Sequence, residues 1–76
     1  MRELLLHILE DAHPGVDYES QTSLIDGGIL DSFDLIMVVT DIKDAFDVEI
    51  TVEDLQPENF NSVDAMLALI ERLQNE

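Results

Sequence analysis

The chain contains no cysteine, which excludes disulfide bridges and thiolate metal sites as means of holding the fold together. No apolar run approaches the roughly 20 residues of a membrane-spanning helix, so we expect no membrane insertion. The first residues, Met1-Arg2-Glu3, show no cleavable signal pattern, and a cytoplasmic location is expected.

Basic residues are nearly as scarce. Arg2, Lys43 and Arg72 stand against 18 acidic residues, and the net charge is −15. Because phosphate binding needs clustered lysine and arginine, this balance excludes nucleic acid as a partner and disfavours anionic membrane surfaces. Proteins with basic patches would be attracted to the chain, at rates that fall with salt. The acidity can also serve only to keep a small domain soluble.

Apolar residues are abundant, at 46% of the 76 residues, and they predict a folded chain in spite of its charge. The length predicts a single domain over residues 1–76. Apolar residues recur at helical spacing over 2–12, 32–46 and 62–74. The expected buried stripes are Leu4, Leu5, Ile8, Leu9 and Ala12; Leu35, Val38, Val39, Ile42 and Phe46; and Val63, Met66, Leu67, Ile70 and Leu73.

Between these helices the pattern is irregular. Residues 13–31 predict a long loop, which is uncommon in a compact domain and usually functional, and its scattered apolar residues predict that it lies over the core. Residues 47–50 are expected to be extended or irregular, with Val48 and Ile50 turned inward, and short helical turns are expected at 51–54 and 57–60. Strand signals are nearly absent. The predicted fold is therefore all-α, a small bundle of three to four helices with a long loop after the first.

Ser32 lies where the loop meets the second predicted helix, with Asp31 before it and Asp34 two residues after it. Either Asp31 or Ser32 can cap this helix. A helix N-terminus also favours a phosphate ester, and Gly27-Gly28 allows the loop to approach closely, so Ser32 is equally placed to carry a phosphate-linked group.

The face of this helix opposite its buried stripe carries an apolar pair with an acidic rim: Phe33, Met37, Thr40 and Asp44, with Asp41 beside them. Such a face predicts a surface for binding a partner. The alternative is that its apolar residues, spaced four apart, only support the helix.

Catalysis and metal binding are not expected. His7 and His13 are the only histidines, their positions do not predict that they face Ser32, and we expect both to be solvated. The carboxylates of residues 26–34 do not follow the spacing of a calcium-binding loop, so no metal site is predicted.

Two stretches resemble the acyl carrier protein family. Leu30-Asp31-Ser32-Phe33 is similar to its phosphopantetheine attachment motif, and residues 43–50, KDAFDVEI, resemble the end of its central helix and the stretch that follows. The resemblance covers nearly the whole chain. It implies an acyl-carrier-like fold, 4′-phosphopantetheine attached to Ser32 from coenzyme A by a holo-carrier synthase, and cargo held as a thioester. It also implies that the protein itself is not an enzyme.

The resemblance further implies roles for the neighbouring residues. Asp31 matches the family aspartate that helps to position the magnesium and coenzyme A of the holo-synthase, and recognition by that enzyme is expected at Asp31, Phe33 and Asp34. Recognition by a loading ligase and by downstream transferases with basic docking patches is expected at Phe33, Met37, Thr40, Asp41 and Asp44. A monomer is expected.

Two departures from the family pattern concern the cargo. Phe33 replaces the usual leucine, and Met37 and Lys43 interrupt the usual run of glutamates. The Asp-Ser-Phe form resembles D-alanyl carrier proteins and some other aminoacyl or specialised acyl carriers, so these are favoured over fatty acid biosynthesis. The competing hypothesis is an unmodified acidic helical interaction module, which needs no free hydroxyl at residue 32.

Overall fold

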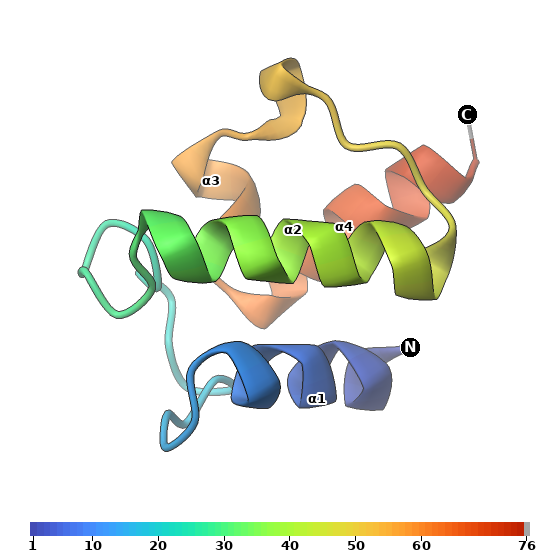
Figure 1. Ribbon diagram of the computed structural model, residues 1–76. Coiled ribbons are helices and arrows are strands. Elements are labelled where there is room, and N and C mark those ends of the chain that lie inside the picture. The colour runs from blue at the N-terminus through green and yellow to red at the C-terminus, as the bar shows by residue number, and fades with distance from the viewer. Residues whose placement is uncertain (76) are drawn as a thin grey trace.

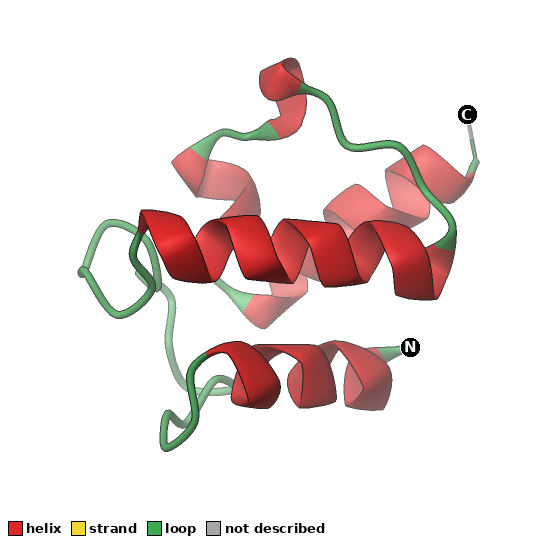
Figure 2. Cartoon of the chain, viewed as in Figure 1, coloured by secondary structure: helices red, strands yellow, loops and turns green. Residues whose placement is uncertain are grey.

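The computed structural model describes residues 1–75 and consists of helices joined by loops. The helices are α1 (Arg2–Ala12), α2 (Ser32–Phe46), α3 (Pro57–Phe60) and α4 (Val63–Gln74), with a 3₁₀ turn η1 (Val52–Asp54) between α2 and α3. Antiparallel helices α1 and α2 lie side by side, and α4 passes behind α2 (Figure 1). No strand occurs within residues 1–75 (Figure 2), and the predicted all-α bundle is confirmed.

The core lies where α1, α2 and α4 meet and is closed by Phe60 of α3, which is fully buried. Most of the predicted stripe residues are buried or partly buried. One prediction was wrong and one buried residue was missed. Leu4 is 45% exposed, because it lies about 90° around α1 from the centre of the buried stripe. On α4, Leu69 is buried although it was not predicted, because it lies only about 60° around the helix from Met66.

The loop of residues 13–31 lies over the core, as predicted. Leu24 and Leu30 are buried in it. Tyr18 is 3% exposed, and its hydroxyl donates to the carbonyl oxygens of Leu9, at 3.1 Å, and of His13. Because those carbonyls end α1, the tyrosine fixes the start of the loop to that helix.

Asn61 holds residues 24–26 of this loop in place. The Asn61 side-chain oxygen accepts from the backbone N–H groups of Ile25 and Asp26, both at 3.0 Å, and its amide nitrogen donates to the Asp26 carboxylate at 3.0 Å. The Asn61 carbonyl also accepts from the N–H of Leu24 at 2.9 Å. The junction of α3 and α4 therefore determines where residues 24–26 lie.

The segment between α2 and α3 is held from both sides. Val48 and Ile50 are buried, as predicted. Arg72 of α4 donates to the Asp54 carboxylate at 3.1 Å, and the same carboxylate accepts from the N–H of Thr51 at 3.1 Å. These contacts fasten η1 against α4. Among the described helices, none combines the length and apolarity needed to cross a membrane.

Candidate functional site

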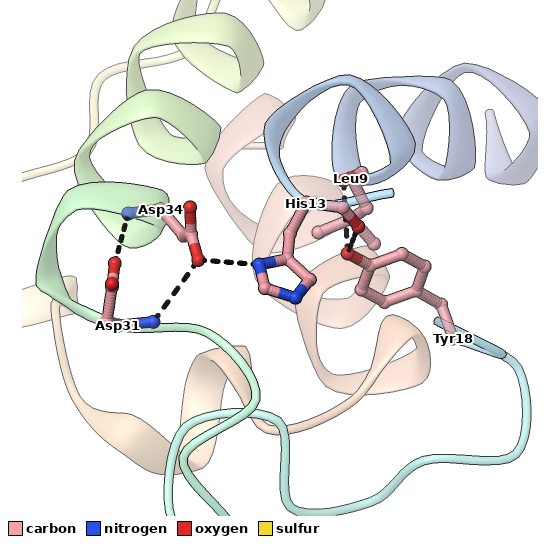
Figure 3. Close-up of polar contacts among 5 residues, drawn as sticks. All are labelled: Leu9, His13, Tyr18, Asp31 and Asp34. Carbon is pink, nitrogen blue, oxygen red and sulfur yellow. Dashed lines mark hydrogen bonds and ion pairs between the residues drawn. The ribbon is translucent and has the colours of Figure 1, made fainter. Parts of the chain in front are cut away.

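The first turn of α2 is closed by a reciprocal pair of aspartates (Figure 3). Asp31 is the N-cap, and its Oδ1 accepts from the N–H of Asp34 at 2.9 Å. Asp34 Oδ2 in turn accepts from the N–H of Asp31 at 3.4 Å. Of the two residues that could cap the helix, Asp31 does so, and Ser32 is the first helical residue.

Because Asp31 caps the helix, the Ser32 hydroxyl is not used for capping. Ser32 is exposed, and no residue in the range 1–75 forms a hydrogen bond with its side chain. The N–H of Asp34 is bound by the cap, and the N–H of Leu35 donates to the Asp31 carbonyl at 2.9 Å. The N–H groups of Ser32 and Phe33 have no partner inside the helix, because they belong to its first turn. A phosphate ester on Ser32 would lie at these amides and at the positive end of the helix dipole.

The carboxylate of Asp34 faces α1 and not the solvent. It is 15% exposed, and its Oδ2 lies 3.0 Å from Nδ1 of His13 (Figure 3). Because a carboxylate only accepts, Nδ1 must carry the proton of this hydrogen bond. Both histidines were expected to be solvated, and His13 is so only in part, because 43% of its side chain is exposed and its ring contacts Asp34. The hydroxyl of Tyr18 donates to the backbone carbonyl of the same histidine, whereas His7 is exposed on α1.

An open groove of about 330 Å³ lies between the preceding loop and α2, and Ser32 is one of its lining residues. We call it the Ser32 groove. It is lined by Ile25, Gly28, Leu30, Asp31, Ser32 and Leu35. Gly28 has a φ of +77°, which most side chains adopt only with strain, and nothing lies within 4 Å of the position of a Cβ there. The loop therefore contributes backbone without a side chain to the groove at this position.

The outward face of α2 is apolar near Ser32 and acidic farther along. Phe33 is 80% exposed and Met37 45% exposed, and Asp44 is exposed on the same helix. The Thr40 hydroxyl is exposed and donates back to the carbonyl of Ile36 at 2.9 Å, while Asp41 is half-buried. The structure thus brings the five residues predicted for partner recognition to one helix and leaves four of them exposed.

Two further exposed apolar residues lie in this region and were missed. Ile36 is 64% exposed on α2, and Leu55 is 39% exposed just after η1. Ile36 and Leu55 help to line a second, smaller groove of about 130 Å³ between α2 and the segment after η1. The spacing within α2 could have indicated Ile36. Nothing in the sequence indicated Leu55, because it reaches the groove from another segment.

No hydrogen bond joins an acid–base side chain to the Ser32 hydroxyl within residues 1–75. Among the described residues, no group of three or more histidine, aspartate or glutamate side chains could hold a metal ion. His13 lies at the site but is engaged with Asp34. What the arrangement offers is an exposed hydroxyl, free backbone amides and an open groove, which fit a phosphate-linked prosthetic arm.

Comparison with known proteins gives the same result. A family model described as "Phosphopantetheine attachment site" matches residues 1–70. No curated protein and no solved structure matches the chain. Proteins of this family carry 4′-phosphopantetheine on a serine. Because the match covers most of the chain, the protein belongs to the phosphopantetheine attachment-site family and is a carrier whose prosthetic group is 4′-phosphopantetheine.

Proposed function

We propose that Ser32 is the attachment residue and that the protein presents acyl or aminoacyl thioesters to partner enzymes from an arm on this residue. The observation that carries the proposal is the exposed Ser32 hydroxyl at the N-terminus of α2, with capping left to Asp31. Two of the other serines are engaged. The Ser62 hydroxyl accepts from the N–H of Ala65 at 3.0 Å and caps α4, and the Ser20 hydroxyl donates to the backbone carbonyl of Asp17 at 3.1 Å.

The attachment step is a phosphoryl transfer performed by a holo-carrier synthase. The Ser32 Oγ attacks the phosphorus of the 4′-phosphopantetheine half of coenzyme A, the bond to adenosine 3′,5′-bisphosphate breaks, and a base of the synthase takes the hydroxyl proton. The attached group supplies a thiol on which cargo is held as a thioester. The chain itself positions the hydroxyl and, in this proposal, catalyses nothing.

Asp31 and Asp34 contribute to attachment in different ways. Asp31 is exposed and uses Oδ1 for capping, which leaves its second carboxylate oxygen open to the magnesium of the synthase. Asp34 is turned towards His13 and is 15% exposed. We therefore propose that Asp31 and Phe33 contact the synthase directly, and that Asp34 acts by holding the first turn of α2 in place.

Partner enzymes are proposed to dock on the outward face of α2. Its apolar residues, Phe33, Ile36 and Met37, lie beside Thr40, Asp41 and Asp44. The two arginines are engaged elsewhere, Arg2 with Glu19 and Asp64 and Arg72 with Asp54. The negative charge of the chain is therefore open to basic docking patches on a loading ligase and on transferases. Weak, electrostatic association suits a monomeric carrier that must leave each enzyme after its step.

The proposed cargo is D-alanine, another amino acid or a specialised acyl group, in the cytoplasm, in preference to the intermediates of fatty acid biosynthesis. The support for this choice is Phe33 after the serine and Met37 in place of an acidic residue. Incubating the holo-protein with ligases for each cargo class and measuring thioester formation by intact mass identifies the cargo.

The attachment residue is tested by intact-protein mass spectrometry after incubation with a holo-synthase and coenzyme A. We expect the wild-type chain to gain one phosphopantetheinyl group and Ser32→Ala to gain none. Ser23→Ala is the matched control, because Ser23 is also exposed and precedes the site. Modification of Ser32→Ala would refute the assignment. An unmodified wild type would favour the acidic interaction module instead.

A further inference from the structure

We propose that the Ser32 groove is a binding site for the pantoyl portion of the prosthetic arm when the arm carries no cargo. This inference rests on the proposal that Ser32 is the attachment residue. It assigns to the loop before α2 a direct contact with the arm, in addition to its place over the core.

The chemical groups of the arm that lie nearest to the serine match the surfaces around it. The arm leaves the serine oxygen as a phosphodiester, and the next unit is the pantoyl group, with two methyl groups on one carbon. The phosphodiester would lie at the free N–H groups of Ser32 and Phe33. The next surface is the apolar side of the groove, formed by Ile25, Leu30 and Leu35. The uncharged, methyl-rich unit therefore meets the apolar walls, and the charged unit stays at the helix end.

The size of the groove suits part of a small molecule. Its volume of about 330 Å³ lies at the lower end of the range of roughly 300–1,000 Å³ in which ligand sites fall. Ser32 is itself part of the lining, so the pantoyl group is tethered next to the groove. Tethering makes the binding intramolecular, and a weak contact is then enough to be populated.

The loop wall of the groove is held in place before the arm is present. Asn61 binds the N–H groups of Ile25 and Asp26 and the Asp26 carboxylate. Farther along the loop, Gly28 donates to the Ile25 carbonyl at 3.1 Å and Leu30 to the Leu24 carbonyl at 2.8 Å. Because the wall is ordered by these bonds, the arm does not have to order the loop when it binds.

The second groove is a poorer site for this unit. It has a volume of about 130 Å³ and is lined by Leu35, Ile36, Val39, Thr40 and Leu55. Neither Asp31 nor Ser32 belongs to its lining, and only Leu35 is shared by the two grooves. The pantoyl unit, which lies closest to the serine, is therefore assigned to the Ser32 groove.

The test is an NMR measurement on the holo-protein, prepared with ¹³C-labelled pantetheine so that signals of the arm are separated from those of the chain. We expect nuclear Overhauser effects from the pantoyl methyl protons to the methyl groups of Ile25, Leu30 and Leu35. Effects only to Ile36, Val39 and Leu55 would overturn the proposal in favour of the second groove. An arm without contacts to either groove would also overturn it.

A pair of matched variants tests the loop wall. Gly28→Asn places a side chain at the groove in a backbone conformation that asparagine tolerates better than most residues. Gly15→Asn is the control, because Gly15 also has a positive φ (+87°) and open space, and does not line the groove. We expect Gly28→Asn to lose at least half of the pantoyl contact intensity and Gly15→Asn to keep it. Equal intensities in the two variants would contradict a site at this wall.

The mass of each sample separates the two proposals. A chain that gains the phosphopantetheinyl group at Ser32 but shows no pantoyl contacts refutes the groove and leaves the attachment residue standing. A chain that gains no group at Ser32 refutes both.

Discussion

The Nδ1 atom of His13 lies 3.0 Å from Oδ2 of Asp34, and this contact joins the end of α1 to the first turn of α2 (Figure 3). The same Asp34 oxygen accepts from the N–H of Asp31. One carboxylate therefore links the preceding helix to the cap of the helix that begins with Ser32. The position of the serine depends on a residue 19 positions before it (32 minus 13).

We expect His13→Ala to lower the free energy of unfolding by about 0.5–1 kcal/mol, because the lost contact is partly exposed and therefore weak. Urea denaturation at pH 7 measures the change. His7→Ala is the control, since His7 is exposed on the same helix, and it should leave the midpoint unchanged. Equal effects of the two substitutions would mean that the contact with Asp34 contributes nothing to stability.

Two substitutions of Asp31 should separate its structural and functional roles. Asp31→Asn keeps an oxygen that can accept from Asp34, so the melting temperature should stay close to that of the wild type. It removes the charge that we assign to the synthase magnesium, and phosphopantetheinylation should slow by at least about tenfold, which corresponds to about 1.4 kcal/mol. Asp31→Ala loses the cap as well and should be destabilised by about 1 kcal/mol. An Asp31→Asn chain that is modified at the wild-type rate would remove Asp31 from the interaction with the synthase.

Because the hydroxyl of Tyr18 is buried, we expect the folded chain to lose stability at high pH. Burial raises the pKa of its hydroxyl from 10.0 to about 12, and the negative charges of Glu10 and Asp34 act in the same direction. Between these two pH values the folded chain keeps the Tyr18 proton, which the unfolded chain has lost. The contribution of this hydroxyl to the free energy of unfolding is therefore fully present below pH 10 and is lost as the pH rises through 12. Its upper limit is about 2–3 kcal/mol.

The measurement uses Tyr18 as its own probe, because it is the only tyrosine in the chain. Absorbance of the phenolate should rise with a midpoint near pH 12 in the folded protein and near pH 10 in urea. Tyr18→Phe should be less stable at neutral pH by about 1 kcal/mol and should lose less stability between pH 10 and 12. A folded-state midpoint near pH 10 would contradict the burial of this hydroxyl.

Positive charges introduced on α2 should slow loading by the partner ligase without unfolding the chain. Both Met37→Lys and Asp44→Lys place a positive charge on the exposed face. We expect each to lower the second-order rate constant of loading by at least about threefold at low salt, because both oppose a basic docking patch. Circular dichroism should show unchanged helix content.

Glu71→Lys on α4 makes the same change of charge as Asp44→Lys at an exposed position on another helix. It should slow loading less than Asp44→Lys does. The wild-type rate constant should also fall as salt is raised from 0.05 to 0.5 M. Rates that are independent of both salt and the position of the new charge would refute electrostatic docking on α2.

Helix positions and the attachment motif could be predicted from the chain alone, because both depend on residues that are close in sequence. Apolar spacing predicted helices over residues 2–12 and 32–46, and these are the bounds of α1 and α2 in the structure. The motif Asp31-Ser32-Phe33 indicated the family. The capping alternatives at Asp31 and Ser32 were also visible locally. Which of the two caps the helix was not, because both residues have side chains that can accept from the first turn.

Contacts between distant segments decided the rest of the site. The burial of Asp34 against His13 spans 21 positions, and the clamp of Asn61 on Ile25 spans 36. Leu55 reaches α2 from beyond the end of that helix. No local sequence pattern specifies contacts between such distant residues, because the sequence around each partner is that of an ordinary surface or loop residue. Only packing of the helices shows that the serine has an open groove beside it and a histidine behind its cap.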